Sequence, residues 1–129
     1  MFTPHTRDTA GALPWEYFPA AAGSYKAGQL LKIDGGQLTA VSAASTTTPP
    51  YLCMADATVE AGGMIPVVRV KHDTVFETTL SAAAESAATG AKLQVAAGGL
   101  QVNAAAEGSF ELVYVDGTEA GSTVRGRFA

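Results

Sequence analysis

Residues 28–41, GQLLKIDGGQLTAV, decide the fold, because a similar stretch, GAKLQVAAGGLQVN, returns at residues 90–103. Each stretch opens with glycine, alternates apolar and polar residues, and carries a Gly-Gly pair between two alternating runs. Alternation is typical of a β-strand with one buried face, and glycine supplies the positive φ of a tight turn. Each stretch therefore predicts a β-hairpin. The Asp-Gly-Gly at residues 34–36 is interpreted as a turn and not as a cation or phosphate site.

The repeat continues past the hairpins, with matched motifs in the same order. Residues 56–58, 61–62 and 69–70 recur as residues 116–118, 120–121 and 127–128. Each half therefore consists of a hairpin, a strand, two turns and a closing strand. About eight short strands with regularly spaced turns predict an all-β fold, a small barrel or sandwich with two repeated halves. We assign this fold to residues 26–129 as a single β domain.

The two halves are joined by an alanine-rich segment, residues 81–90, SAAAESAATG. Ser81 is a suitable N-cap and Gly90 a suitable C′ residue, with helix-favouring residues between them. The segment predicts one short helix of about one or two turns, which would need packing because isolated helices of this length are marginal.

Residues 1–25 are predicted to form an extended N-terminal arm outside the compact domain. Pro4, Pro14 and Pro19 interrupt regular structure in this region. The densest aromatic cluster of the chain, residues 15–18, lies between these prolines. Its aromatic area needs a covering surface. Two interpretations are open: the cluster packs back onto the chain's own barrel, or it docks on a neighbouring subunit.

The charge of the chain argues against nucleic acid as a partner. The net charge is −4 and only eight residues are Lys or Arg, whereas neutralising phosphates requires clustered basic residues. Charged residues make up 16% of the chain, below the usual share of about a quarter, which favours a protein that works in an assembly. No apolar run approaches the roughly eighteen residues of a membrane span, so no membrane partner is expected.

No motif for catalysis, or for binding a metal or cofactor, stands out. His5 and His72 are not spaced as metal ligands with each other or with Cys53. The sequence has no nucleophile elbow, phosphate loop or dinucleotide fingerprint. The single cysteine lies in an apolar run typical of a buried thiol, and its lack of a partner fits a reducing compartment. We therefore predict no enzyme activity, no catalytic residue, no metal and no cofactor.

The chain from residue 26 to residue 127 resembles the small capsid decoration, or cement, proteins of tailed bacteriophages and prophages. The resemblance rests on the glycine turns and alternating strands of residues 26–31, 35–36, 51–56, 61–63, 67–70, 90–93, 120–121 and 124–127. It implies a small β-barrel domain that forms homotrimers on the outer face of the capsid and bridges neighbouring coat subunits. The implied partners are further copies of the chain and the major capsid protein. The implied location is the virion, after synthesis in the cytoplasm of the bacterial host.

We expect the partner-binding residues to be Trp15, Tyr17 and Phe18 in the arm and Arg125 and Arg127 in the last strand. Under this hypothesis, deleting residues 1–25 leaves the barrel folded and abolishes capsid binding. Two alternative functions are open. One is a head-fibre base or display module on the virion surface, and the other is a small carbohydrate-binding or hydrolytic barrel domain.

Overall fold

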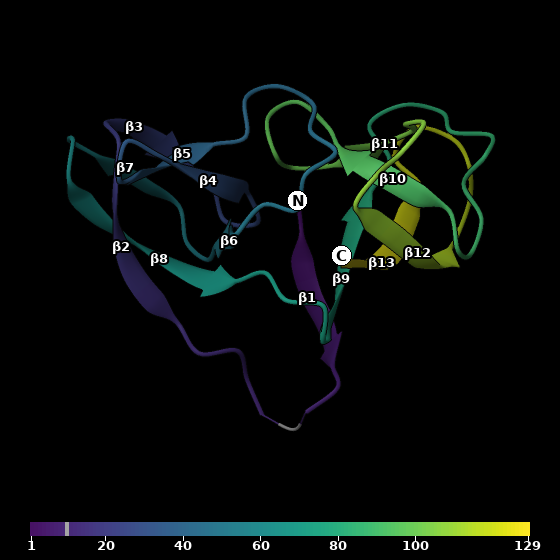
Figure 1. Ribbon diagram of the computed structural model, residues 1–129, viewed down its shortest axis with the longest axis horizontal. Coiled ribbons are helices and arrows are strands. Elements are labelled where there is room, and N and C mark those ends of the chain that lie inside the picture. The colour runs from purple at the N-terminus through teal and green to yellow at the C-terminus, as the bar shows by residue number, and fades with distance from the viewer. Residues whose placement is uncertain (10) are drawn as a thin grey trace.

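The computed structural model describes residues 1–9 and 11–129, and within them the chain is all-β and has no helix (Figure 1). Strand β1 (Thr3–Arg7) comes first, and the first half follows with β2 (Glu16–Ala20), β3 (Gly23–Tyr25), β4 (Leu30–Asp34), β5 (Gln37–Ala40), β6 (Tyr51–Cys53), β7 (Ala57–Val59) and β8 (Gly63–Arg69). The second half contains β9 (Thr74–Thr79), β10 (Lys92–Val95), β11 (Val102–Asn103), β12 (Phe110–Val115) and β13 (Thr123–Phe128). The predicted fold class, an all-β protein with a small barrel, is confirmed.

Five strands of the first half form a closed barrel in the order β2-β5-β4-β6-β8, and β3 pairs with β7 beside it. Strands β4 and β5 are the predicted hairpin, which ends with the pairing of Asp34 and Gln37. Gly35 and Gly36 form the turn with φ of 59° and 80°, a conformation that glycine adopts without steric cost. The Asp-Gly-Gly motif is therefore the turn that the sequence predicted.

The second half repeats this strand order within a six-stranded sheet, β1-β9-β13-β12-β10-β11. The strands of the two halves correspond in pairs: β9 to β2, β11 to β5, β10 to β4, β12 to β6 and β13 to β8. The closing contact is repeated too, because Ala20 pairs in parallel with Leu38, and Leu80 forms a parallel bridge with Val102. The repeat inferred from the sequence is a repeat of topology, but its match in the last strand was wrong by one residue, because Arg69 corresponds to Phe128 and not to Arg127. Figure 1 shows the two halves on opposite sides of the molecule, with β1 between them.

Backbone hydrogen bonds at the turns support the same correspondence. In the first half the Gly62 amide donates to the Ala20 carbonyl (2.8 Å), and in the second half Gly121 donates to Leu80 (2.8 Å). In the same way, Gly28 donates to Cys53 (2.8 Å) in the first half and Gly90 donates to Leu112 (2.7 Å) in the second. The two glycines that open the repeated stretches, Gly28 and Gly90, have φ of 82° and 91°. The glycines that the two halves share therefore fix equivalent bends of the backbone.

The second hairpin, β10 and β11, has a longer connection than the first. Val95 pairs with Val102, so residues 96–101 join the strands, whereas two glycines suffice in the first hairpin. This connection packs against the first half, where the Leu30 amide donates to the Gly99 carbonyl at 2.8 Å. This connection therefore adds backbone contacts between the two halves.

The predicted helix at residues 81–90 is wrong, because this segment consists of bends and turns. Ala84 and Ala87 are buried, and the Ala84 amide donates to the Thr118 carbonyl at 2.8 Å. A helix this short forms too few internal hydrogen bonds to compete with such tertiary contacts.

Two hydrophobic cores hold the fold together. The barrel core contains Ala20, Tyr25, Leu31, Leu38, Tyr51, Cys53, Ile65 and Val67. The second core lies between the halves, where Leu30, Leu52 and Val68 of the barrel wall meet the inner face of the six-stranded sheet. Side chains alternate along a strand, so β4, β6 and β8 each supply residues to both cores.

The prediction that residues 1–25 lie outside the compact fold is wrong. Strand β1 pairs with β9 in the second half, and β2 completes the barrel of the first half. Phe2 is 1% exposed and its ring centroid lies 5.8 Å from that of Phe110 and 5.9 Å from that of Phe128. Proline has no amide hydrogen to donate, so it is tolerated where a strand edge is unpaired. In the part of the chain that the structure describes, β1 has one such edge, and one edge of β2 pairs only at Ala20, so Pro4 and Pro19 are compatible with these strands. Deleting residues 1–25 would therefore remove parts of both halves.

Candidate partner-binding surface

An exposed apolar stripe runs over strands β2 and β8 of the barrel. We define the apolar stripe as Trp15, Tyr17, Pro19, Met64 and Pro66. Tyr17 is paired with Pro66 and Pro19 with Met64, so these four side chains share the outer face of the two strands. Trp15, Tyr17 and Met64 are 52%, 60% and 56% exposed. Large apolar side chains that gather at this exposure are typical of an interaction site.

The corresponding face of the second half is polar. Glu77 stands where Tyr17 stands in the barrel, and Arg125 stands where Pro66 stands. Arg125 donates through Nε to Glu77 Oε2 at 2.7 Å, and its guanidinium lies 4.7 Å from the Tyr114 ring centroid. The fold therefore accepts charged residues at these backbone positions. The apolar stripe is not a requirement of the fold.

Trp15 also borders a groove at the junction of the halves. The groove has a volume of about 400 Å³ and lies between β1 and the chain that leads into β2. Its apolar lining includes Pro4, Leu13, Trp15 and Met54. The apolar surface thus continues from the stripe into a concave site.

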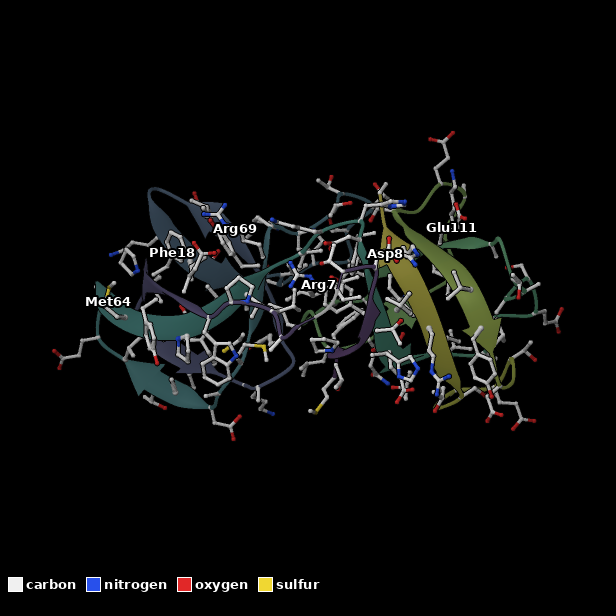
Figure 2. The ribbon with its side chains drawn as sticks, turned by 90° about the horizontal axis from the view of Figure 1, so that it is seen from below. Arg7, Asp8, Phe18, Met64, Arg69 and Glu111 are labelled. Atoms are coloured by element: carbon white, nitrogen blue, oxygen red, sulfur yellow. The ribbon has the colours of Figure 1, made fainter. Side chains whose placement is uncertain are left out.

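Phe18, the third aromatic residue of the predicted site, points the other way. It packs on the barrel core, and its ring centroid lies 4.8 Å from that of Tyr51. The Arg69 guanidinium lies 5.9 Å from the Phe18 ring centroid and 5.4 Å from that of Tyr51. Arg69 Nε also donates to Glu16 Oε2 at 2.8 Å, and this hydrogen bond raises the pKa of Arg69. Figure 2 shows Phe18 and Arg69 side by side on the barrel half, with Met64 at its outer end.

Arg125 and Arg127 lie in the second half, and both are engaged within the chain. Arg127 donates through Nη2 to Asp8 Oδ1 at 2.8 Å and through Nη1 to the His72 carbonyl at 3.0 Å. These contacts hold the end of β1 against the sheet. The structure therefore brings Trp15 and Tyr17 together as an exposed group, whereas it uses Phe18 and the two arginines to support the fold.

Sequence reasoning missed Met64 and Pro66. Pro66 alone indicated an edge or a bulge, because proline cannot donate a ladder hydrogen bond. The available signal was that residues 64 and 66 are apolar on both sides of Ile65, so both faces of this strand are apolar. Only the pairing with β2 shows that the outer face is exposed.

The cysteine and His72 are both engaged in contacts within the chain. Burial raises the pKa of the Cys53 thiol, which is fully buried and donates to the Ala55 carbonyl at 3.2 Å. His72 Nδ1 lies 2.7 Å from the Phe128 carbonyl. Within residues 1–9 and 11–129, no three His, Cys, Asp or Glu residues are grouped to hold a metal ion.

The part of the chain that the structure describes contains no helix of the length and hydropathy needed to cross a membrane. Neither a protein-family model nor a curated protein matches the chain.

Proposed function

We propose that this chain is a structural virion protein, a capsid decoration protein that bridges coat subunits on the outside of a phage head. The observation that carries the proposal is the apolar stripe on β2 and β8, which the matched face of the second half lacks. The resemblance of residues 26–127 to cement proteins supports the same function. Assembly as a homotrimer belongs to the proposal and is checked by mass measurement in solution.

The proposed mechanism is mechanical. A bridging protein needs a rigid body, and the shared core between the halves supplies one. It also needs apolar area that is left exposed until it meets the shell, which Tyr17 and Met64 offer. Many equivalent sites on one shell add modest contacts into a large gain in shell stability.

Thermal stability of the shell tests the proposal. Expanded shells of the major capsid protein from the same phage are heated with and without the chain, and the proposal predicts disruption at a higher temperature with it. The variant Tyr17→Ser/Met64→Ser should bind shells roughly a hundredfold more weakly, because two large apolar side chains lose their burial. Ile33→Ser removes a 51% exposed apolar residue from the β4–β5 hairpin and serves as the matched control.

Two results would count against a cement function. If the chain binds shells and their disruption temperature does not change, the chain is a display module. If it does not bind shells at all, the decoration function is wrong.

A second candidate function is a carbohydrate-binding barrel domain, favoured by one observation. Trp15 lies directly before β2 and Tyr17 within it, two residues apart, and both side chains are more than half exposed. Paired aromatic faces can stack on sugar rings. A glycan array with the wild-type chain and the Trp15→Ala variant tests this function, which requires a binding signal that the variant loses.

A further inference from the structure

The second half contains one strand that the first half lacks. Strand β1 pairs with the part of β9 from Thr74 to Glu77, along the edge that faces away from β13. The strand that corresponds to β9 is β2, whose edge away from β8 pairs only at Ala20. Within the described residues, no strand lies against the rest of this edge. We call the backbone of residues 15–19 on this side the open edge of β2.

The backbone of Tyr17 faces the open edge. The Ala21 amide donates to the Leu38 carbonyl across this edge at 2.9 Å. Backbone groups alternate between the two edges of a strand, so the amide and carbonyl of Tyr17 point the same way as the Ala21 amide. Pro19 also has this orientation and already lacks an amide hydrogen. In the second half, the counterpart of Tyr17 is Glu77, which pairs with Thr3 of β1.

The side chains around the open edge determine what could lie there. On the outer face, Tyr17 and Met64 offer apolar surface. On the inner face Phe18 covers the buried Tyr51, and the half-exposed Arg69 is paired with Glu16 at 2.8 Å. An apolar segment therefore fits the outer face.

The second half shows which side chain reaches the inner face. Phe110 and Phe128 are the counterparts of Tyr51 and Arg69, because each pair is matched across neighbouring strands. Phe2, the residue just before the paired Thr3, contacts both phenylalanine rings. In the first half Phe18 of β2 itself packs on Tyr51 at 4.8 Å and lies 5.9 Å from the Arg69 guanidinium, so a partner strand need not supply this ring.

The exposed area indicates a single segment and not a second copy of the chain. Full burial of an aromatic side chain removes about 150–250 Å², so half-exposed Trp15, Tyr17 and Met64 together offer roughly 300–400 Å². A stable interface takes about 800 Å² from each partner. One extended segment gains backbone hydrogen bonds in addition to this area.

We infer that the open edge of β2 binds an extended segment of the coat subunit, which pairs antiparallel to β2 at Tyr17. This inference rests on the proposed function. The partner segment would lie along β2 as β1 lies along β9.

Substitution of Tyr17 separates backbone pairing from side-chain contact. Tyr17→Ser removes the ring and keeps the amide, whereas Tyr17→Pro removes both. Because Pro19 is tolerated in the same orientation, both variants should keep the β2–β8 pairing and melt within a few degrees of each other. On expanded shells of the same phage, Tyr17→Pro should bind about three- to tenfold more weakly than Tyr17→Ser, the effect of one hydrogen bond.

Amide hydrogen exchange on the wild-type chain gives a second measurement that does not depend on the folding of a variant. The Tyr17 amide should exchange freely in the unbound chain and become protected on shells. If it exchanges equally in both states, or if Tyr17→Pro binds as well as Tyr17→Ser, the open edge is not the binding site although decoration stands. If the wild-type chain does not bind shells, the proposed function and this inference both fall.

Discussion

The two halves have the same strand order but fill equivalent positions with different chemistry. In the second half Phe76, Phe110 and Phe128 form a fully buried cluster with Phe2. In the first half the matched positions hold Glu16, Tyr51 and Arg69, which form an ion pair over an aromatic ring. One half is therefore sealed by Phe2 of β1, whereas in the other Phe18 of β2 covers Tyr51 and the edge of β2 pairs only at Ala20.

On the outer faces it is the second half that carries the ion pair and the first half that carries the apolar residues. The second half pairs Glu77 with Arg125 where the first half places Tyr17 beside Pro66. Glycines at the turns are shared because positive φ is a demand of the backbone, which both halves have in common. Exposed side chains carry no such demand. The backbone therefore does not dictate the difference between the outer faces.

The largest expected effect comes from removing the residue that seals the second half. Phe2→Ala empties a site that is 1% exposed and lined by Phe110 and Phe128. The free energy of unfolding should fall by about 3–5 kcal/mol, the usual cost of Phe→Ala in a core. Urea-induced unfolding measures the change.

The first half supplies the control for this variant. Tyr17→Ser changes an aromatic residue that is 60% exposed, and its unfolding free energy should stay within about 0.5 kcal/mol of wild type. Equal losses from Phe2→Ala and Tyr17→Ser would mean that β1 is not the seal that distinguishes the halves.

A smaller effect is expected from adding a side chain at a position where the first half has one and the second half has glycine. Gly126 corresponds to Val67 of the barrel, and a Cβ at Gly126 would lie 2.5 Å from the Glu111 carbonyl and 2.8 Å from the Phe110 ring. Gly126→Ala should therefore destabilise the fold by about 1–3 kcal/mol through overpacking. Adding Phe110→Leu should recover part of the loss if the ring is a cause. An unchanged unfolding midpoint for Gly126→Ala would show that β13 has room for a side chain there.

Features set by neighbouring residues could be predicted from the sequence. The hairpin turn at residues 34–36 and the order of motifs in each half follow from glycine and alternation, which act locally. The topology of the repeat then follows from that order. The helix at residues 81–90 failed because burial of Ala84 and Ala87 outweighs a weak local preference.

The position of the N-terminal residues could not be predicted, because it depends on contacts distant in sequence. Phe2 is placed by Phe110 and Phe128, and no local pattern in residues 1–25 indicates those partners. The candidate surface combines residues that were singled out from the sequence with others that were not. Trp15 and Tyr17 are exposed as a partner site requires, but Met64 becomes part of the same surface only through strand pairing.

The smallest expected effect concerns the ionic contacts that hold β1 on the second half. The first half has no strand corresponding to β1 among the described residues. The Thr74 hydroxyl donates to Asp73 Oδ1 at 2.9 Å and lowers the pKa of that carboxyl, with Arg7 at 3.5 Å adding to the shift. A lowered pKa stabilises the fold above the ordinary value of 3.8, and this contribution is lost as the pH falls through the folded-state pKa. Asp73→Asn should therefore be less stable than wild type at pH 6 by an amount typical of an exposed ion pair, about 0.2–1 kcal/mol, and the difference should close as the pH falls below 3.8. Urea unfolding across this range measures it, with Glu107→Gln, a change at an exposed carboxylate of a connecting segment, as the control. A gap between wild type and Asp73→Asn that stays constant with pH would show that the Asp73 charge does not help to hold β1.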